Sequence, residues 1–316
     1  MSFLKDKIII LLICVFVLTF SSCSKKASPN RITIAEQYGL AYAPLQIMRE
    51  KGFLEEINPR AEVHWVTLGN TAAIREAALA GDVDAGFLGI PPYLISYDKG
   101  MTWKIATGLS QSPLGLVVND DLINGQNEFD SKTLLALPQP GSIQHILLAM
   151  GLENQYGEHD RWDEALVSMN HPDGMNALFN GAVAGHFTSP PYLFREMDES
   201  GYSLYMTGRE AMGGPFTFIV GVVTEDFYNH NPGLYRDYLK ALDQSIDFIK
   251  RNRKETLEIL GSLYELEPEV LSDYLYDRGM VYSQDVLGLE VFLDFMAERD
   301  MISDDISPEE VFFEAP

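Results

Sequence analysis

Short apolar runs and amphipathic helical patterns alternate along residues 32–224. The short runs are bounded by Gly, Pro or Asn and predict buried strands, and the stretches between them carry apolar residues at helical spacing. This alternation predicts an α/β protein. The expected strands are 32–34, 63–66, 85–88, 103–107, 114–118, 134–137, 165–168 and 217–224, and the expected helices are 43–51, 71–80, 93–99 and 142–155.

After Glu225 the pattern becomes helical throughout. Two apolar stripes at helical spacing mark the clearest helices of this region. We expect these C-terminal helices to pack on the first half of the molecule and to contribute bulk rather than chemistry. The stripes are Leu239, Leu242, Ile246 and Ile249, and then Val286, Leu289, Phe292, Leu293 and Met296.

Residues 81–94 and 181–193 resemble each other. Both segments begin with Gly, have Val at the third position and Phe at the seventh, and end in Pro-Pro-Tyr-Leu. The alternative is a chance recurrence of the tetrapeptide, but the matched upstream positions favour an internal duplication. A helix-strand-loop-helix unit in each half predicts two similar lobes whose Pro-Pro loops face one cleft, because open parallel sheets bind ligands beyond the carboxyl ends of their strands.

Two apolar strands divide the chain between these lobes. The strand at 114–118 is expected to leave the first lobe, and the strand at 217–224 is expected to return to it. The first lobe is then formed by residues 31–117 and 218–316, and the second lobe by residues 118–217. Two crossings of this kind make a hinge.

The first 30 residues predict export. Lys5 and Lys7 precede an apolar run over residues 8–20, which is too short to span a bilayer and fits the core of a signal peptide. Cys23 follows two serines, so residues 1–22 are expected to be a lipoprotein signal, with Cys23 as the lipidation site and residues 23–30 as a tether. Phe20 replaces the usual Leu of the cleavage box. The alternative is an ordinary secretory signal or a signal anchor, and the expected location is the periplasm or the outer face of the cell membrane.

Composition narrows the possible functions of the exported chain. The only two cysteines are Cys14, inside the apolar run, and Cys23, so none remains for a disulfide, a thiolate nucleophile or a cysteine metal site. The formal net charge of −23 argues against binding to nucleic acid. We expect a monomer.

Two loops that precede predicted helices could bind a polar ligand. Residues 69–71 (Gly-Asn-Thr) and residues 140–145 (Pro-Gly-Ser-Ile-Gln-His) offer free backbone N–H groups, as an anionic group needs. The alternative for each loop is a plain N-cap, in which Asn70 or Ser142 binds only its own helix. Their equivalent places in the two halves favour the binding interpretation.

Several segments resemble a known family of binding proteins. Residues 39–44, 51–52, 80–84 and 87–89, together with Lys104, look like the substrate-binding proteins of nitrate, sulfonate, taurine and thiamine-precursor ABC importers. The resemblance covers nearly the whole mature chain. It implies a two-lobed fold of the periplasmic-binding-protein type, in which each lobe is a mostly parallel sheet flanked by helices and two strands form the hinge. It also implies a small-molecule ligand and ABC permease subunits as partners, with no cofactor and no metal.

The same resemblance places ligand-binding residues in the loops of both lobes. Tyr38 and Tyr42 could stack on a planar ligand or simply pack, and His145 could contact a ligand or serve as a capping or core residue. The expected binding residues are Gln37, Tyr38, Tyr42, Asn70, Thr71, Gly89, Ile90, Ser142, His145, Asn170, Ser189 and Pro190.

Ligand chemistry and function class remain open at this point. No Lys or Arg falls in these loops, which disfavours a multiply charged anion and leaves a small anion or, with a slight preference, a neutral organic molecule. No catalytic or phosphate-binding motif is present, and the six histidines do not pair at metal spacing. A pyrimidine-precursor-synthase-like enzyme on the same fold and a ligand-sensing lobe for a signalling partner are the alternatives to a binding protein.

Overall fold

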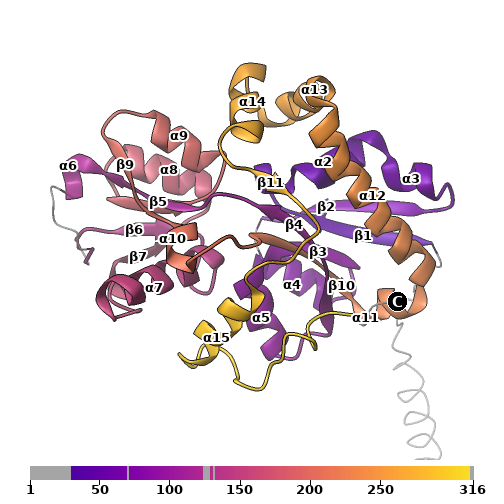
Figure 1. Ribbon diagram of the computed structural model, residues 1–316, viewed down its shortest axis with the longest axis horizontal. Coiled ribbons are helices and arrows are strands. Elements are labelled where there is room, and N and C mark those ends of the chain that lie inside the picture. The colour runs from indigo at the N-terminus through magenta and orange to yellow at the C-terminus, as the bar shows by residue number, and fades with distance from the viewer. Residues whose placement is uncertain (1–29, 70, 124–128, 131, 314–316) are drawn as a thin grey trace, which may run out of the picture.

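Two β-sheets lie side by side along the long axis of the molecule, each with helices on its faces (Figure 1). The computed structural model describes residues 30–69, 71–123, 129–130 and 132–313. The predicted signal peptide, the tether up to residue 29, Cys23 and Asn70 lie outside the described residues. Among the helices of the described part, none is long and apolar enough to cross a membrane.

The first sheet has the order β11-β4-β10-β3-β1-β2. One side of this sheet is parallel, because β1 pairs in parallel with both β2 and β3. On the other side, β10 runs antiparallel to β3 and β4, and β11 runs antiparallel to β4. The strands are β1 (Arg31–Glu36), β2 (Glu62–Thr67), β3 (Ala85–Gly89), β4 (Trp103–Gln111), β10 (Ile219–Thr224) and β11 (Val281–Tyr282).

The second sheet has the order β7-β6-β8-β5-β9. Strand β6 pairs in parallel with β7 and β8, whereas β5 runs antiparallel to β8 and β9. The strands are β5 (Gly115–Asn119), β6 (Leu135–Leu137), β7 (Leu166–Ser168), β8 (Gly185–Thr188) and β9 (Tyr202–Thr207).

Helices cover both sheets, and the last helices return to the first sheet (Figure 1). Helix α12 packs against α2 and α3, where the rings of Phe53 and Phe248 lie 5.7 Å apart. The helices are α2 (Ala43–Lys51), α3 (Phe53–Ile57), α4 (Thr71–Leu79), α5 (Ile90–Asp98), α6 (Asp120–Ile123), α7 (Ile143–Tyr156), α8 (His171–Phe179), α9 (Tyr192–Asp198), α10 (Gly208–Met212), α11 (Glu225–His230), α12 (Pro232–Arg251), α13 (Arg253–Tyr264), α14 (Pro268–Tyr276) and α15 (Leu289–Ala297), with 3-10 turns η1 (Leu40–Tyr42) and η2 (Asp163–Ala165).

The two copies of the repeat occupy equivalent places in the two sheets. In the first sheet, β3 lies between the antiparallel strand β10 and the parallel strand β1, and in the second sheet, β8 lies between the antiparallel strand β5 and the parallel strand β6. Each of these strands leads into a helix, α5 or α9. The matched sequences thus correspond to matched topology. The expectation of two Pro-Pro loops is met only in the second copy, where Pro190 and Pro191 lie between β8 and α9, because Pro91 and Pro92 belong to the first turn of α5.

The chain passes between the sheets twice. It leaves the first sheet after β4 and enters the second at β5, and it returns between β9 and β10. The first of these passages contains Pro113, which has no N–H to donate and therefore separates strands β4 and β5. The boundary expected at residue 117 falls inside β5, which pairs along its length with β8 and β9. We call residues 30–111 and 219–313 lobe 1 and residues 115–207 lobe 2.

The expectation that only helices follow Glu225 is wrong at one place. Strand β11 pairs with the end of β4, and Tyr282 of this strand donates a hydrogen bond from its hydroxyl to the Leu40 carbonyl oxygen at 2.7 Å. A two-residue strand is too short to show a period in the sequence. The chain around it therefore resembled an interval between helices.

Candidate functional site

A cavity of about 970 Å³ lies between the two lobes, at the carboxyl ends of their strands. Its size falls in the range of small-molecule pockets, which is roughly 300–1,000 Å³. Its lining residues come from both lobes. They are Glu36, Gln37, Tyr38, Gly39, Ala41, Tyr42, Gln46, Arg49, Thr67, Gly69, Thr71, Gly89, Pro92, Pro138, Gln139, Ser142, Ile143, Gln144, Asn170, His171, Pro172, Ser189, Pro190, Pro191, Tyr192, Phe218, Ile219, Leu263, Tyr264 and Glu265.

Most of the residues expected to bind ligand come together at this cavity. Two do not line it. Ile90 is fully buried in the core, and His145 is turned back toward its own helix start. The expected residues that line the cavity are Gln37, Tyr38, Tyr42, Thr71, Gly89, Ser142, Asn170, Ser189 and Pro190. Their contact with a ligand stays a prediction.

The two tyrosines of the first loop have different surroundings. The side chain of Tyr38 is 77% exposed, whereas Tyr42 lies in η1 and is 5% exposed. An exposed aromatic ring at the edge of a cavity can stack on a ligand without leaving a packed position. Tyr38 is therefore the better candidate for stacking.

The starts of α7 and α8 in lobe 2 are capped by side chains of their own N-cap residues. Ser142 Oγ accepts a hydrogen bond from the His145 backbone N–H at 3.3 Å, and Asn170 Oδ1 accepts one from Asp173 N–H at 3.0 Å. His145 Nδ1 accepts from Gly141 N–H at 3.2 Å, and its Nε2 lies 3.6 Å from the Asp163 carboxylate. These contacts match the capping alternative for Ser142 and His145, since their polar atoms serve the start of α7.

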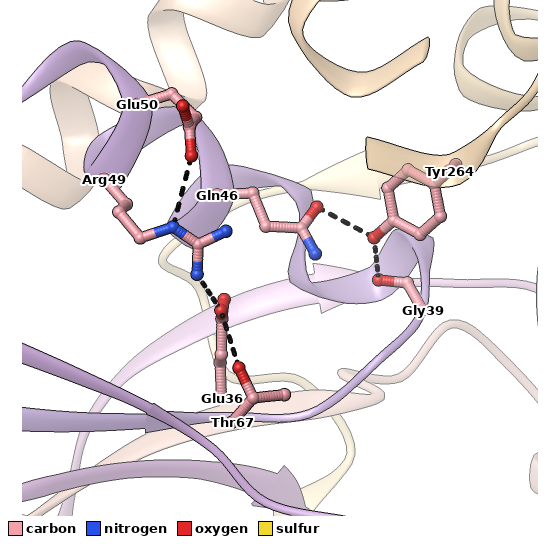
Figure 2. Close-up of polar contacts among 7 residues, drawn as sticks. All are labelled: Glu36, Gly39, Gln46, Arg49, Glu50, Thr67 and Tyr264. Atoms are coloured by element: carbon pink, nitrogen blue, oxygen red, sulfur yellow. Dashed lines mark hydrogen bonds and ion pairs between the residues drawn. The ribbon is translucent and has the colours of Figure 1, made fainter. Parts of the chain in front are cut away.

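A buried ion pair forms part of the lobe 1 wall (Figure 2). Glu36, at the end of β1, is 2% exposed, and its Oε1 pairs with the Arg49 guanidinium from α2 and accepts a hydrogen bond from Thr67 at 3.5 Å. Burial raises the pKa of Glu36, although Arg49 counteracts part of that effect. Arg49 was not among the residues expected at the site, because it lies in helix α2 rather than in a loop after a strand.

The C-terminal helices also reach the cavity. Tyr264, at the end of α13, donates a hydrogen bond to the Gly39 carbonyl oxygen at 2.6 Å and contacts Gln46 Oε1 at 2.8 Å (Figure 2). Gly39 has φ of +128°, in the region that favours glycine. The expectation that these helices add only bulk is therefore wrong, because Tyr264 lines the cavity and holds the loop that bears Tyr38.

Histidines meet on the lobe 2 wall. His171, at the start of α8, stacks on Tyr192 with ring centroids 5.8 Å apart, and its Nδ1 lies 3.4 Å from Nε2 of His186 on β8. His186 Nδ1 lies 2.6 Å from Glu196 Oε1 on α9, and both of these side chains are fully buried. Fifteen residues separate the two histidines along the chain, so their spacing gave no signal of this contact.

Positive charge is scarce at the cavity. Of the described lining residues, Arg49 is the one with a cationic side chain, and its guanidinium contacts both Glu36 and Glu50. Within the described residues there is no group of three or more His, Cys, Asp or Glu side chains that could hold a metal ion. A ligand in this cavity would find hydrogen-bonding groups and apolar rings rather than an unpaired cation.

The two lobes also touch beside the cavity. Arg278, which follows α14, forms an ion pair with Asp198 of α9 at 2.7 Å and a second one with Asp273 at 2.6 Å. The rings of Phe194 and Tyr274 pack between the same helices with centroids 5.0 Å apart. We call Phe194, Asp198, Tyr274 and Arg278 the α9–α14 contact.

Solved structures of other proteins share this architecture, although no family model and no curated protein sequence matches the chain. The alkanesulfonate-binding protein SsuA from Xanthomonas axonopodis pv. citri, bound to MOPS, aligns with a TM-score of 0.76 and 17% identity, covering 92% of this chain and 100% of that one. The periplasmic nitrate-binding protein NrtA from Synechocystis PCC 6803 aligns with a TM-score of 0.69 and 15% identity, covering 88% and 83%.

A third similar structure is described as having the generic periplasmic binding protein fold. A Candida albicans gene product with the generic periplasmic binding protein fold aligns with a TM-score of 0.69 and 12% identity, covering 89% of this chain and 93% of that one. The chain thus has the two-lobed periplasmic-binding-protein-like fold, as its sequence predicted. At these identities the likeness concerns the fold, and the ligand must be argued from the cavity.

Proposed function

We propose that this protein is the solute-binding component of an ABC importer. The observation that carries the proposal is the cavity itself, which is lined by residues from both lobes at the carboxyl ends of their central strands. A ligand there contacts lobe 1 and lobe 2 at once, so it stabilises the closed arrangement relative to an open one. The names of the similar structures, which include sulfonate- and nitrate-binding proteins, support this class.

The charge of the cavity bears on the ligand. Arg49 is already paired with Glu36, and Glu265 adds a second acidic side chain to the lining. An anion with several charges would face these carboxylates without an unpaired cation to offset them. A neutral organic molecule, or a small anion held by hydrogen bonds, fits better, and the classes to test are sulfonates, nitrate, taurine and pyrimidine or thiamine precursors.

The mechanism that we propose is closure about a hinge. The chain crosses between the lobes twice, near Pro113 and again before β10, and these short crossings can absorb the change in backbone angles. The closed protein would then deliver its ligand to the membrane subunits of the permease. Lipid on Cys23 would hold the protein at the membrane, and we propose that it works as a monomer without a cofactor.

Ligand screening tests this function directly. The chain from Ser24 onward is mixed with sulfonates, nitrate, taurine, bicarbonate, pyrimidines and flavins, and its melting temperature is followed. At about 100 times the dissociation constant, a true ligand adds roughly 2.7 kcal/mol to the free energy of unfolding. Mass spectrometry of the purified protein identifies any molecule that copurifies.

A selective shift in melting temperature supports the proposal. Turnover of a compound would favour the enzyme alternative, and binding without a permease partner would favour the sensor.

A further inference from the structure

A line of polar side chains runs from the cavity into the core of lobe 2. It begins at Ser189, whose Oγ lies 3.4 Å from His171 Nε2, and continues from His171 Nδ1 to His186 Nε2 at 3.4 Å. It ends where His186 Nδ1 meets Glu196 Oε1 at 2.6 Å. The line crosses three elements, since His171 starts α8, His186 lies on β8 and Glu196 lies on α9.

The close approach of α8 to β8 is built into the sequence. A Cβ added at Gly174 of α8 would lie 2.5 Å from His186 Nε2, a distance that packed atoms do not tolerate. Glycine at this position lets the helix lie against the histidine. His171, one turn earlier on the same helix, is thereby placed between the buried His186 and the cavity.

The inner end of the line, His186 and Glu196, is buried in the core, where an ionised group is unfavourable. His186 and Glu196 are both fully buried, no Lys or Arg of the described residues pairs with Glu196, and its Oε2 has no hydrogen-bond partner within that part of the chain. A neutral imidazole alone compensates little of the hydration that an ionised carboxylate loses on burial. Burial raises the pKa of Glu196 to about 9 and lowers the pKa of His186 to about 3. The pair therefore keeps one shared proton at neutral pH.

That shared proton fixes the direction of every hydrogen bond in the line. Whether it sits on Glu196 or on His186 Nδ1, the other nitrogen of His186, Nε2, carries a hydrogen and can donate it to His171 Nδ1. The Thr188 hydroxyl, 3.0 Å from His171 Nδ1, can donate there as well. His171 then carries its own proton on Nε2, which faces the cavity.

Among the described residues, the Nε2 atom of His171 has only long contacts. Its neighbours are the Gln144 side-chain nitrogen at 3.3 Å and Ser189 Oγ at 3.4 Å, and both contacts are long for hydrogen bonds to nitrogen. Nδ1 of the same ring also has a long contact, to His186 at 3.4 Å, but in addition it has the Thr188 hydroxyl at 3.0 Å, which is within the usual range. This tautomer requires the Gln144 amide to be placed the other way round, with its oxygen rather than its nitrogen toward the ring. Stacking on Tyr192 holds the plane of the ring. The N–H of His171 is thus oriented and only weakly used.

We infer that His171 is the ligand-contacting residue of lobe 2 and that the buried His186–Glu196 pair positions it as a hydrogen-bond donor. The ligand, in consequence, presents an acceptor oxygen to this wall, either from an oxyanion or from a neutral group. This inference rests on the proposed binding function. Without the shared proton, His186 Nε2 would accept a hydrogen bond from His171 instead of donating one. The proton of His171 would then lie on Nδ1, and its Nε2 would accept a hydrogen bond from a donor group of the ligand.

The ionisable groups around this line are few. His186 faces His171 from β8, Tyr192 faces it from α9, and Glu196 lies behind His186 on α9. The α7 helix contributes Gln144, and the end of β8 and the loop after it contribute Thr188 and Ser189, all of which are neutral. A pH-dependent change in the tautomer of His171 therefore reports on the His186–Glu196 pair.

The test reads the tautomer by ¹⁵N NMR of the imidazole rings, first in the unliganded protein. The His171 signals are assigned from their loss in His171→Gln. At pH 7 we expect a neutral His171 ring with the proton on Nε2. As the pH passes the raised pKa of Glu196, the Nδ1–H form should grow from about one tenth to about nine tenths over two pH units. In Glu196→Gln, whose amide can donate to His186 in place of the shared proton, the Nε2–H form should persist.

Ligand contact is read with three small probes. Methanesulfonate and dimethyl sulfone offer acceptor oxygens with and without charge, and tetramethylammonium offers none. A shift of the His171 Nε2–H signal with an acceptor probe alone supports the inference and shows which kind of oxygen the wall prefers. A proton on Nδ1 at pH 7, equal titration in Glu196→Gln, or no response to either acceptor would overturn it. The tautomer is measured without ligand, so a failed ligand screen and a wrong tautomer remain distinguishable.

Discussion

Each wall of the cavity contains a buried glutamate, and the two are neutralised in different ways. Glu36 in lobe 1 meets the guanidinium of Arg49, which carries a permanent charge, whereas Glu196 in lobe 2 meets only the imidazole of His186. The pKa of both carboxyls is raised by burial, but that of Glu36 is held back by its cation. In lobe 1 an ion pair offsets the cost of burying the carboxyl group, and in lobe 2 the carboxyl group avoids this cost by keeping its proton.

Because the partners of the two glutamates differ, we expect the lobe 2 wall to respond to pH. The guanidinium of Arg49 keeps its charge through the neutral range, so the partner of Glu36 in lobe 1 does not change with pH. The His186–Glu196 pair can change its proton count and with it the polarity of His171. Four substitutions, at Arg49, Glu196, Tyr264 and Arg278, test this difference between the walls and the contacts around them.

Removal of Arg49 should be the most costly change. Arg49→Met leaves the carboxylate of Glu36 buried without its cation, and we expect a loss of about 2 kcal/mol in the free energy of unfolding, the desolvation cost of an unpaired buried group. Urea unfolding at pH 7 measures this loss. The control is the double variant Glu36→Gln, Arg49→Met, which removes both charges and should recover much of the stability. A single variant no less stable than the double would contradict the ion-pair interpretation.

Glu196 should make stability fall as the pH rises. In the unfolded chain a glutamate loses its proton near pH 4.5, but in the folded protein Glu196 keeps it up to about pH 9. The folded state binds more protons across that window, so each pH unit lowers the free energy of unfolding. His186, with a pKa lowered from 6.5 to about 3, opposes this trend only below pH 6.5.

The window from pH 6.5 to 9 therefore isolates the glutamate. We expect the wild type to lose stability relative to Glu196→Gln at a rate on the order of 1 kcal/mol per pH unit, with the difference levelling off above pH 9. Unfolding in urea at half-unit steps of pH gives the difference curve. Glu36→Gln serves as the matched lobe 1 variant, and parallel curves for Glu196→Gln and the wild type would show that the pair holds no extra proton.

Tyr264 connects helix α13 to the lobe 1 wall of the cavity through Gly39 and Gln46. Tyr264→Phe removes the hydrogen bonds to Gly39 and Gln46, and we expect a loss of about 1 kcal/mol together with weaker retention of ligand. The matched control is Tyr276→Phe, which loses a comparable 2.9 Å bond to the Ile249 carbonyl. Tyr276 is not a lining residue. Both variants should unfold earlier in urea, but only Tyr264→Phe should alter the thermal shift given by a ligand.

These contrasts also mark what the sequence could predict. Strands, helices, the duplicated unit and the two lobes all followed from local patterns, because periodicity and Gly-Pro punctuation are set by neighbouring residues. The loops after the strands were also foreseeable, since chain order places them at one edge of each sheet. Gln37, Ser189 and Pro190, which the resemblance to binding proteins singled out in these loops, line the cavity.

The groups that give the walls their chemistry were not foreseeable. Arg49 reaches Glu36 across 13 residues, Tyr264 reaches Gly39 across 225, and His186 meets His171 across 15. Such contacts depend on how helices pack on a sheet, which no local period encodes. The reverse error occurred at Ile90 and His145, which lie beside the right loops but point into the core or back to a helix start.

Arg278 should affect the opening of the cleft more than stability. Its ion pair with Asp198 joins the lobes at the α9–α14 contact, and both partners are partly exposed, so Arg278→Ala should change the free energy of unfolding by about 0.5 kcal/mol or less. The same loss weakens a link between lobes that the open form lacks. We expect the unliganded variant to have a larger radius of gyration by X-ray scattering than the unliganded wild type.

The matched control for Arg278 is Arg253→Ala. Arg253 also lies over a tyrosine, Tyr276, and near an aspartate, Asp277, but all three belong to the C-terminal helices and do not bridge the lobes. Its loss should leave the radius of gyration unchanged. If Arg278→Ala scatters like the wild type, the α9–α14 contact does not hold the lobes together. The polarity of the two walls, rather than direct contact between lobes, would then decide how readily the cleft closes on its ligand.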